Sequence, residues 1–228
     1  MQNIFLIMSI AQNLLHIKSK LPNHVNLVAV SKTKPVSDLM EAYNAGQRIF
    51  GENKIQEMTD KWEQMPKDIE WHMIGHVQTN KVKFMAEYVS LIHGVDSLKL
   101  LQEINKQALK HNRIIDCLLQ IYIANEETKF GLDEKELNEL ITSKEFKELQ
   151  NIRIIGLMGM ATFTENQYQI KAEFQHLKTI FDTINNQDNL KLETLSIGMS
   201  GDYELAIEFG STMVRIGSSI FGNRNYQH

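Results

Sequence analysis

The chain is poor in cysteine: Cys117 is alone among 228 residues, so no disulfide can form within it. Cys117 lies in the apolar run IIDCLLQIYI, where we expect a buried and inert thiol. A chain without a disulfide framework suits a reducing compartment, so we expect a cytoplasmic protein.

Prolines are also few, and no run of proline, glycine, serine or like charges divides the chain. Such runs mark linkers between domains, and their absence favours one continuous fold. We therefore predict a single domain that spans residues 1–228.

Long apolar runs are missing too, and none approaches the roughly 20 residues that a membrane-spanning helix needs. The N-terminal stretch MQNIFLIMSIAQNLLHIKSK lacks the preceding positive charge and the cleavage site of a signal peptide. Its residues Ile4, Ile7, Met8, Ala11 and Leu15 recur at helical spacing. Residues 1–20 are predicted to form an amphipathic helix that packs on the domain.

Neither sign of charge dominates, since 24 Lys and Arg face 28 Asp and Glu for a net charge of -4. Binding to a phosphate backbone needs clustered cations, and the absence of a dense basic run argues against nucleic acid as a partner. Outside the WHMIGH segment, the histidines form no H-x-x-x-H pair and have no cysteine at metal-ligand spacing. No metal site is therefore predicted.

Short apolar runs rich in β-branched residues are abundant. Eight of them begin near residues 26, 48, 69, 88, 114, 152, 192 and 213. Helical patterns lie between most of them, the clearest over residues 170–184. Strands that alternate with helices predict a parallel sheet covered by helices. Eight such units in this length, without a dinucleotide or P-loop fingerprint, favour a closed (β/α)8 TIM barrel over an open sheet.

Functional groups of such barrels gather where strands end, and the loops after strands seven and eight stand out there. Their sequences, GMSGD and RIGSSIFGNR, are rich in glycine and serine. Hydroxyl and backbone N–H groups of Ser200 and Ser218 are suited to a phosphate dianion, although glycine and serine also make ordinary helix caps.

The first strand ends in AVSKTKP, and strand alternation places Val28, Val30 and Lys32 on one face. If that face points inward, Lys32 stands in the mouth of the barrel, while Lys34 lies out in the loop. An amine that loses hydration has a lower pKa and attacks an aldehyde more readily. Lys32, a phosphate site and Arg215 on the eighth strand would together hold pyridoxal phosphate.

Six segments, VAVSKTKP, GQRIFGENKIQE, EWHMIGHVQTNK, TKFG, GLMGMAT and LSIGMSGDYELAIEFGSTMVRIGSSIFGNRNY, resemble in order and spacing the YggS/PROSC family of pyridoxal phosphate homeostasis proteins. The resemblance implies the alanine racemase N-terminal barrel without the racemase's β-rich C-terminal domain. It also implies an internal aldimine on Lys32, phosphate contacts from Ser200, Gly217 and Ser218, Arg215 at the pyridine nitrogen, and Asn53 beside the cofactor.

The resemblance further implies binding, buffering or delivery of the cofactor without turnover, with pyridoxal phosphate-dependent apo-enzymes as acceptors. An arginine opposite the ring nitrogen does not give up its proton, so the ring is a weaker electron sink. The sequence ends at His228, soon after the eighth strand, so we expect no counterpart of the racemase domain that supplies a second base. Without that domain we expect a monomer.

Two alternatives stay open at this point. A low-activity amino-acid racemase or lyase would recruit His72, His76 or Tyr122 as a base. The structural interpretation of these residues is that His72 and Tyr122 pack within strands and that His76 begins a helix. A lyase without pyridoxal phosphate would instead use Lys32 on a sugar-phosphate carbonyl. The EETKFG loop after strand five is expected to help close the mouth.

Overall fold

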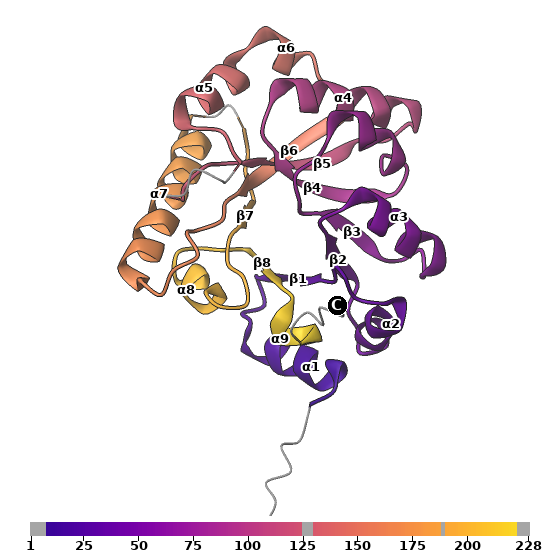
Figure 1. Cartoon of the computed structure of the whole chain (residues 1–228). Coiled ribbons are helices and arrows are strands. Elements are labelled where there is room, and N and C mark those ends of the chain that lie inside the picture. The colour runs from indigo at the N-terminus through magenta and orange to yellow at the C-terminus, as the bar shows by residue number, and fades with distance from the viewer. Residues whose placement is uncertain (1–7, 125–129, 188–189, 223–228) are drawn as a thin grey trace, which may run out of the picture.

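The eight predicted strands pair in sequence order, and β1 pairs with β8 to close the barrel. The computed structural model describes residues 8–124, 130–187 and 190–222. All the strand pairs are parallel, which confirms the predicted (β/α)8 barrel (Figure 1). The strands are β1 (Asn26–Val30), β2 (Ile49–Glu52), β3 (Glu70–Met73), β4 (Val89–Val95), β5 (Ile115–Gln120), β6 (Ile152–Met158), β7 (Thr194–Ser196) and β8 (Met213–Ile216).

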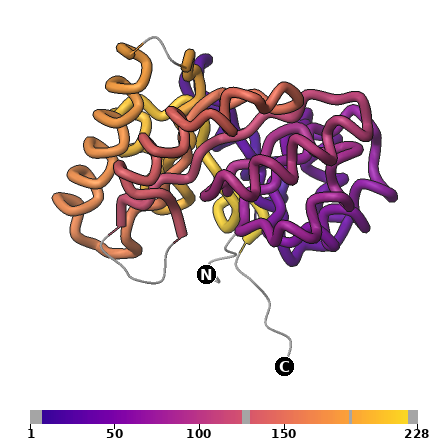
Figure 2. The backbone as a smooth tube through the Cα atoms, turned by 90° about the horizontal axis from the view of Figure 1, so that it is seen from above, coloured from indigo at the N-terminus to yellow at the C-terminus, as the bar shows by residue number. Residues whose placement is uncertain are grey.

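Helices surround the barrel, and one of them is of the 3-10 type. The view from above places α7 along one edge and the N-terminal half of the chain along the other (Figure 2). The helices are α1 (Ile10–Lys20), α2 (Val36–Asn44), α3 (Ile55–Gln64), η1 (Thr79–Phe84, the 3-10 helix), α4 (Leu98–Lys110), α5 (Glu134–Thr142), α6 (Lys144–Lys147), α7 (Gln167–Asn186), α8 (Tyr203–Glu208) and α9 (Ser218–Phe221).

The apolar stripe predicted over residues 170–184 is the buried face of α7. Ile170, Phe174, Leu177 and Ile184 are buried against the barrel, which confirms the helical spacing. The side chain of Asn166 caps the helix by accepting hydrogen bonds from the backbone N–H groups one turn further on.

The strands divide their side chains between two apolar cores. One face packs under the helices, and the other forms a small interior cluster of Val28, Leu91, Leu118, Met158 and Met213. Residues two positions further along a strand lie on the same face. His93 therefore follows Leu91, and Arg215 follows Met213, so the interior becomes polar toward the carboxyl ends of the strands.

The N-terminal helix α1 begins at Ile10, and Ser9 caps it through a capping box. Its buried residues are Leu14 and Ile17, whereas Leu15 is 56% and Met8 44% exposed. The buried face therefore differs from the one predicted. The helix packs on α9 and α2, and the first seven residues lie outside the described part.

Cys117 is fully buried in β5, as predicted. Burial raises the pKa of its thiol, so the group stays protonated at neutral pH. A protonated, enclosed thiol is not a nucleophile, which confirms the expectation of an inert cysteine.

Within the residues that the structure describes, no helix is both long and apolar enough to cross a bilayer. The same residues contain no group of three or more histidine, cysteine, aspartate or glutamate side chains arranged to hold a metal ion.

Candidate functional site

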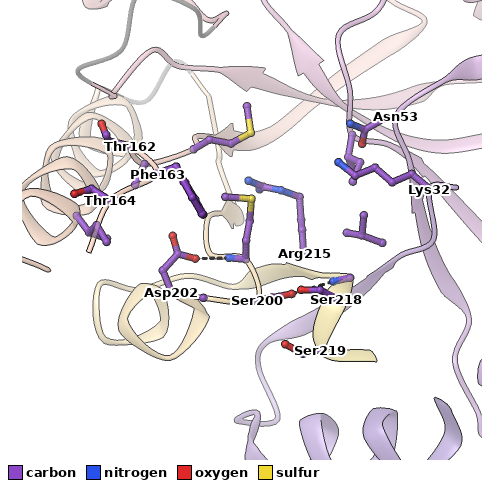
Figure 3. Close-up of a pocket in the computed structure, with 18 of the residues that line it drawn as sticks. Lys32, Asn53, Thr162, Phe163, Thr164, Ser200, Asp202, Arg215, Ser218 and Ser219 are labelled. Carbon is purple, nitrogen blue, oxygen red and sulfur yellow. Dashed lines mark hydrogen bonds between the residues drawn. The ribbon is translucent and has the colours of Figure 1, made fainter. Parts of the chain in front are cut away.

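A cavity of about 730 Å³ opens at the carboxyl ends of the strands. All six residues predicted to hold a cofactor line it: Lys32, Asn53, Ser200, Arg215, Gly217 and Ser218. Figure 3 shows Lys32 and Asn53 on one wall, Arg215 in the middle and the serines below. The volume falls within the range of cofactor and small-molecule pockets.

Lys32 reaches the cavity because strand alternation continues past the end of β1. Val28 belongs to the barrel interior, and Val30 and Lys32 both line the cavity. Lys32 is half-buried, and its side chain points toward Arg215 (Figure 3). The structure thus places this amine where the alternation predicted.

The prediction that Lys34 lies out in the loop was wrong. Its side chain is half-buried and lines the same cavity, and its Nζ donates a hydrogen bond to the carbonyl oxygen of Phe221 at 2.8 Å. The chain turns back on itself here, because the N–H of Lys34 donates to the carbonyl oxygen of Ser31 at 3.1 Å. That turn returns the second lysine to the cavity wall.

Arg215 is a fixed, buried cation beside the cavity, with 4% of its surface exposed. Its Nη1 donates to the carbonyl oxygen of Ser196 at 2.7 Å and to the Ser196 hydroxyl at 2.6 Å. Its Nη2 donates to the carbonyl oxygen of Gly159 at 3.0 Å. Burial lowers the pKa of Arg215 to about 10, so the guanidinium is still charged at neutral pH.

Two buried histidines continue this network into the barrel, and we call Arg215, Ser196, His93 and His72 the inner histidine chain. The Ser196 hydroxyl lies 3.2 Å from Nδ1 of His93, and Nε2 of His93 lies 3.1 Å from Nδ1 of His72. Burial lowers the pKa of His72 to about 3 and that of His93 well below its usual value, so both rings are neutral.

Arg215 only donates, so the Ser196 hydroxyl accepts its hydrogen bond and retains one hydrogen of its own to give. We infer that this hydrogen points to His93 Nδ1, which would place the proton of His93 on Nε2 as a donor to His72. The chain therefore orients Arg215 without adding a second charge to the interior.

The serines form the opposite part of the lining. The hydroxyl oxygen of Ser200 accepts a hydrogen bond from the N–H of Gly217 at 3.3 Å, which ties the loop after β7 to the loop after β8. Ser218 and Ser219 add two hydroxyl groups from the start of α9. Gly198 has a φ of 96° and permits the tight turn that brings Ser200 into place.

The three candidate bases are not among the described residues that line the cavity. His72 is buried within β3, as the structural interpretation predicted. Tyr122 lies just past β5 rather than within it. His76 does not begin an α-helix but lies in the loop before η1, where its ring stacks on Phe130 at 4.4 Å. Residues 125–129, which include most of the EETKFG loop, lie outside the described residues.

A second polar network lies on the helix side of β1 and β2, and we call Ser31, Glu52, Glu57 and Lys61 the outer charged cluster. Lys61 Nζ donates to the carbonyl oxygen of Ser31 at 2.8 Å and to Oε1 of both Glu52 and Glu57 at 2.7 Å. Glu52 is fully buried, and its Oε2 has no hydrogen-bond partner among the residues that the structure describes. Burial raises the pKa of Glu52 despite the nearby Lys61.

Sequence reasoning missed both networks. The available signal was alternation: Glu52 lies on the same face as the buried Phe50, so its charge requires a buried partner. Lys61 follows Glu57 by one helical turn and meets that requirement.

Comparison with known proteins gives consistent results. The model of the alanine racemase N-terminal domain family matches residues 7–225. A pyridoxal phosphate homeostasis protein of Aquifex aeolicus is 41% identical over 205 residues, which are 90% of this chain and 89% of the relative. One from Escherichia coli K12 is 38% identical over 239 residues, covering 95% and 97%.

Among solved structures, PipY of Synechococcus elongatus without pyridoxal phosphate has a TM-score of 0.89 and 35% identity, with 94% of this chain and all of PipY covered. The same protein with pyridoxal phosphate bound has a TM-score of 0.86 and 36% identity over the same shares of the two chains. Clostridium difficile alanine racemase has a TM-score of 0.77 at 16% identity. Its match covers 96% of this chain but only 58% of the racemase, so this likeness concerns the barrel fold alone.

Proposed function

The chain belongs to the family of pyridoxal phosphate homeostasis proteins, and from that membership we propose that it binds pyridoxal 5′-phosphate in the cavity and holds it reversibly. The observation that carries the proposal is the convergence of two lysines, one buried arginine and three serines on a single cavity. The lysines follow β1, whereas the arginine and the serines come from the last two β/α units at the other end of the sequence.

The donor set fits the three polar parts of that molecule. When bound, pyridoxal phosphate supplies an aldehyde whose C=O is exchanged for a C=N bond to a primary amine, with the release of one water. Lys32 is the proposed amine and would hold the cofactor covalently. Ser200, Gly217 and Ser218 would donate to the phosphate, and Arg215 would face the ring nitrogen.

We propose that the protein stores and delivers the cofactor rather than turning over a substrate. Arg215 retains its proton at neutral pH, since its pKa stays near 10. Facing the ring nitrogen, it would donate a hydrogen bond and leave that nitrogen unprotonated, which would weaken the ring as an electron sink. The inner histidine chain supports this state, because two neutral rings beside Arg215 offer it no base strong enough to remove the proton.

Delivery requires an acceptor amine, and we propose pyridoxal phosphate-dependent apo-enzymes as the acceptors of a monomeric carrier. An acceptor amine that reached the mouth of the cavity would form the C=N bond in place of Lys32, whose amine would be released. The molar mass of the purified protein from light scattering tests whether it is monomeric. Activation of an apo-enzyme by the protein loaded with pyridoxal phosphate tests delivery.

The covalent anchor is tested by the absorption spectrum after addition of pyridoxal phosphate, followed by borohydride. We expect wild type to show a visible band and a reduced adduct that mass spectrometry maps to Lys32. Lys32→Ala should lose both completely, because the amine is absent.

Lys34→Ala is the matched control, since it removes the second lysine of the same cavity and should retain the adduct on Lys32. An adduct on Lys34 in wild type, or no adduct, contradicts the proposal. Borohydride trapping of a sugar phosphate without the cofactor would instead identify a lyase.

A further inference from the structure

The residue after Lys32 has an unusual backbone conformation. Thr33 has a φ of 64°, in the left-handed region that β-branched residues rarely adopt. A conformation of this kind persists only where surrounding contacts hold it. The contacts at this turn therefore indicate what the turn is for.

Both peptide groups that flank Lys32 are held from α3. The carbonyl oxygen of Ser31, on one side, accepts a hydrogen bond from Lys61 Nζ at 2.8 Å. The N–H of Thr33, on the other side, donates to Glu57 Oε1 at 2.5 Å. Lys61 and Glu57 also bind each other at 2.7 Å, so one ion pair holds both peptide groups.

This arrangement determines the direction of the Lys32 side chain. The two peptide groups are held on the helix side of the barrel, and the side chain between them points to the cavity side. The side chain of Glu52 is fully buried, and its Oε1 lies 2.7 Å from Lys61 Nζ. The Lys61 side chain is 6% exposed, so the ammonium group that binds the Ser31 carbonyl oxygen is itself enclosed by its partners.

We propose that Glu57 and Lys61 are positioning residues that aim Lys32 Nζ into the cavity by binding the peptide groups on either side of it. The inference rests on the proposed function only in taking Lys32 as the amine that bonds to pyridoxal phosphate. Neither positioning residue touches the cavity itself, so their effect passes through the backbone.

The test compares two ligands on Glu57→Ala, which removes the acceptor of the Thr33 N–H. A covalent bond to pyridoxal phosphate requires a correctly aimed amine, whereas pyridoxine 5′-phosphate has an alcohol in place of the aldehyde and forms no bond to the amine. We expect the apparent Kd for pyridoxal phosphate to rise about tenfold, because the strained turn is no longer held. The Kd for pyridoxine 5′-phosphate should stay unchanged.

Two further variants examine the turn itself. Adding Thr33→Gly to Glu57→Ala should restore most of the affinity, because glycine adopts a positive φ without steric cost. Glu57→Gln retains an acceptor oxygen and should lose much less than Glu57→Ala. Glu136→Ala is the control, since it removes a first-turn glutamate of the capping box of α5 and should leave both ligands unaffected.

A measurement without any ligand keeps the inference separate from the proposed function. The Thr33 amide hydrogen should exchange with solvent about tenfold faster in Glu57→Ala than in wild type, because its acceptor is gone. Unchanged exchange, or an equal loss of affinity for both ligands, would overturn the inference. Faster exchange in a protein whose wild type forms no covalent adduct would instead reject the proposed function alone.

Discussion

The outer charged cluster and the inner histidine chain lie on opposite sides of the sheet and have the same role toward the cavity. Each orients one side chain of the cavity, Lys32 in the first case and Arg215 in the second. The outer cluster does so with buried charges, while the inner chain adds only neutral groups to its arginine. The difference shows two ways to hold a buried cation: carboxylates pack against Lys61, whereas neutral carbonyl and hydroxyl acceptors surround Arg215.

The largest expected effect comes from removing the cation of the outer charged cluster. Lys61→Met keeps the length of the side chain but leaves the Glu52 carboxylate buried without its cation, with the Ser31 hydroxyl still donating to it. We therefore expect a loss of about 3–5 kcal/mol in the free energy of unfolding. Urea unfolding measures it. Because the pKa of Glu52 is already raised, the loss should be larger at pH 8 than at pH 5, where the carboxyl is more easily protonated.

Two variants sharpen this result. Lys178→Met breaks the more exposed ion pair with Asp182 on α7 and should cost about 0.5 kcal/mol or less. Glu52→Gln combined with Lys61→Met makes the cluster resemble the neutral inner chain and should recover part of the stability. A Lys61→Met protein as stable as wild type would show that the buried charges do not depend on each other.

The second effect is a loss of stability in acid from the inner histidine chain. The pKa of His72 is about 3 in the folded protein and near 6.5 in the unfolded chain. The unfolded chain therefore binds more protons between these values, and stability falls as pH falls through this window. From pH 7 to pH 5 the loss for His72 is about 2 kcal/mol.

Urea unfolding of wild type and His72→Asn at both pH values measures this contribution. The variant should lose about 2 kcal/mol less than wild type between pH 7 and pH 5, because it has no ring to protonate. An identical pH dependence of the two proteins would mean that His72 is protonated in the folded state.

The third effect concerns the hydroxyl that links the inner histidine chain. Ser196→Ala leaves a nitrogen of His93 and a donor of Arg215 without this partner, so we expect a loss of about 1–3 kcal/mol. Nitrogen NMR of the histidine rings should place the proton of His93 on Nε2 in wild type and show a mixture of tautomers in the variant. Ser19→Ala, on the exposed end of α1, is the control for stability. A proton on Nδ1 of wild-type His93 would reverse the direction of the chain.

Three local predictions were wrong, each for its own structural reason. Residues 1–20 contain more than one apolar spacing, and α1 packs on α9 and α2 with the face that carries Leu14. His76 lies in a loop because the segment after β3 forms the short 3-10 helix η1 instead of an α-helix. Lys34 reaches the cavity because of one turn, whose geometry depends on Glu57 from another element.

By itself, the sequence determined the barrel, the inward face of β1 with Lys32 at its end, and the serine and glycine loops after β7 and β8. These features depend on periodicity and on local residue types, which act over a few residues. Only the tertiary structure decided which side chains orient them. Ser196 meets His93 across 103 positions, and Lys61 meets Ser31 across 30. Such pairs form because closure of the sheet buries polar groups, which then require hydrogen-bond partners. No local sequence pattern specifies which distant residue becomes the partner.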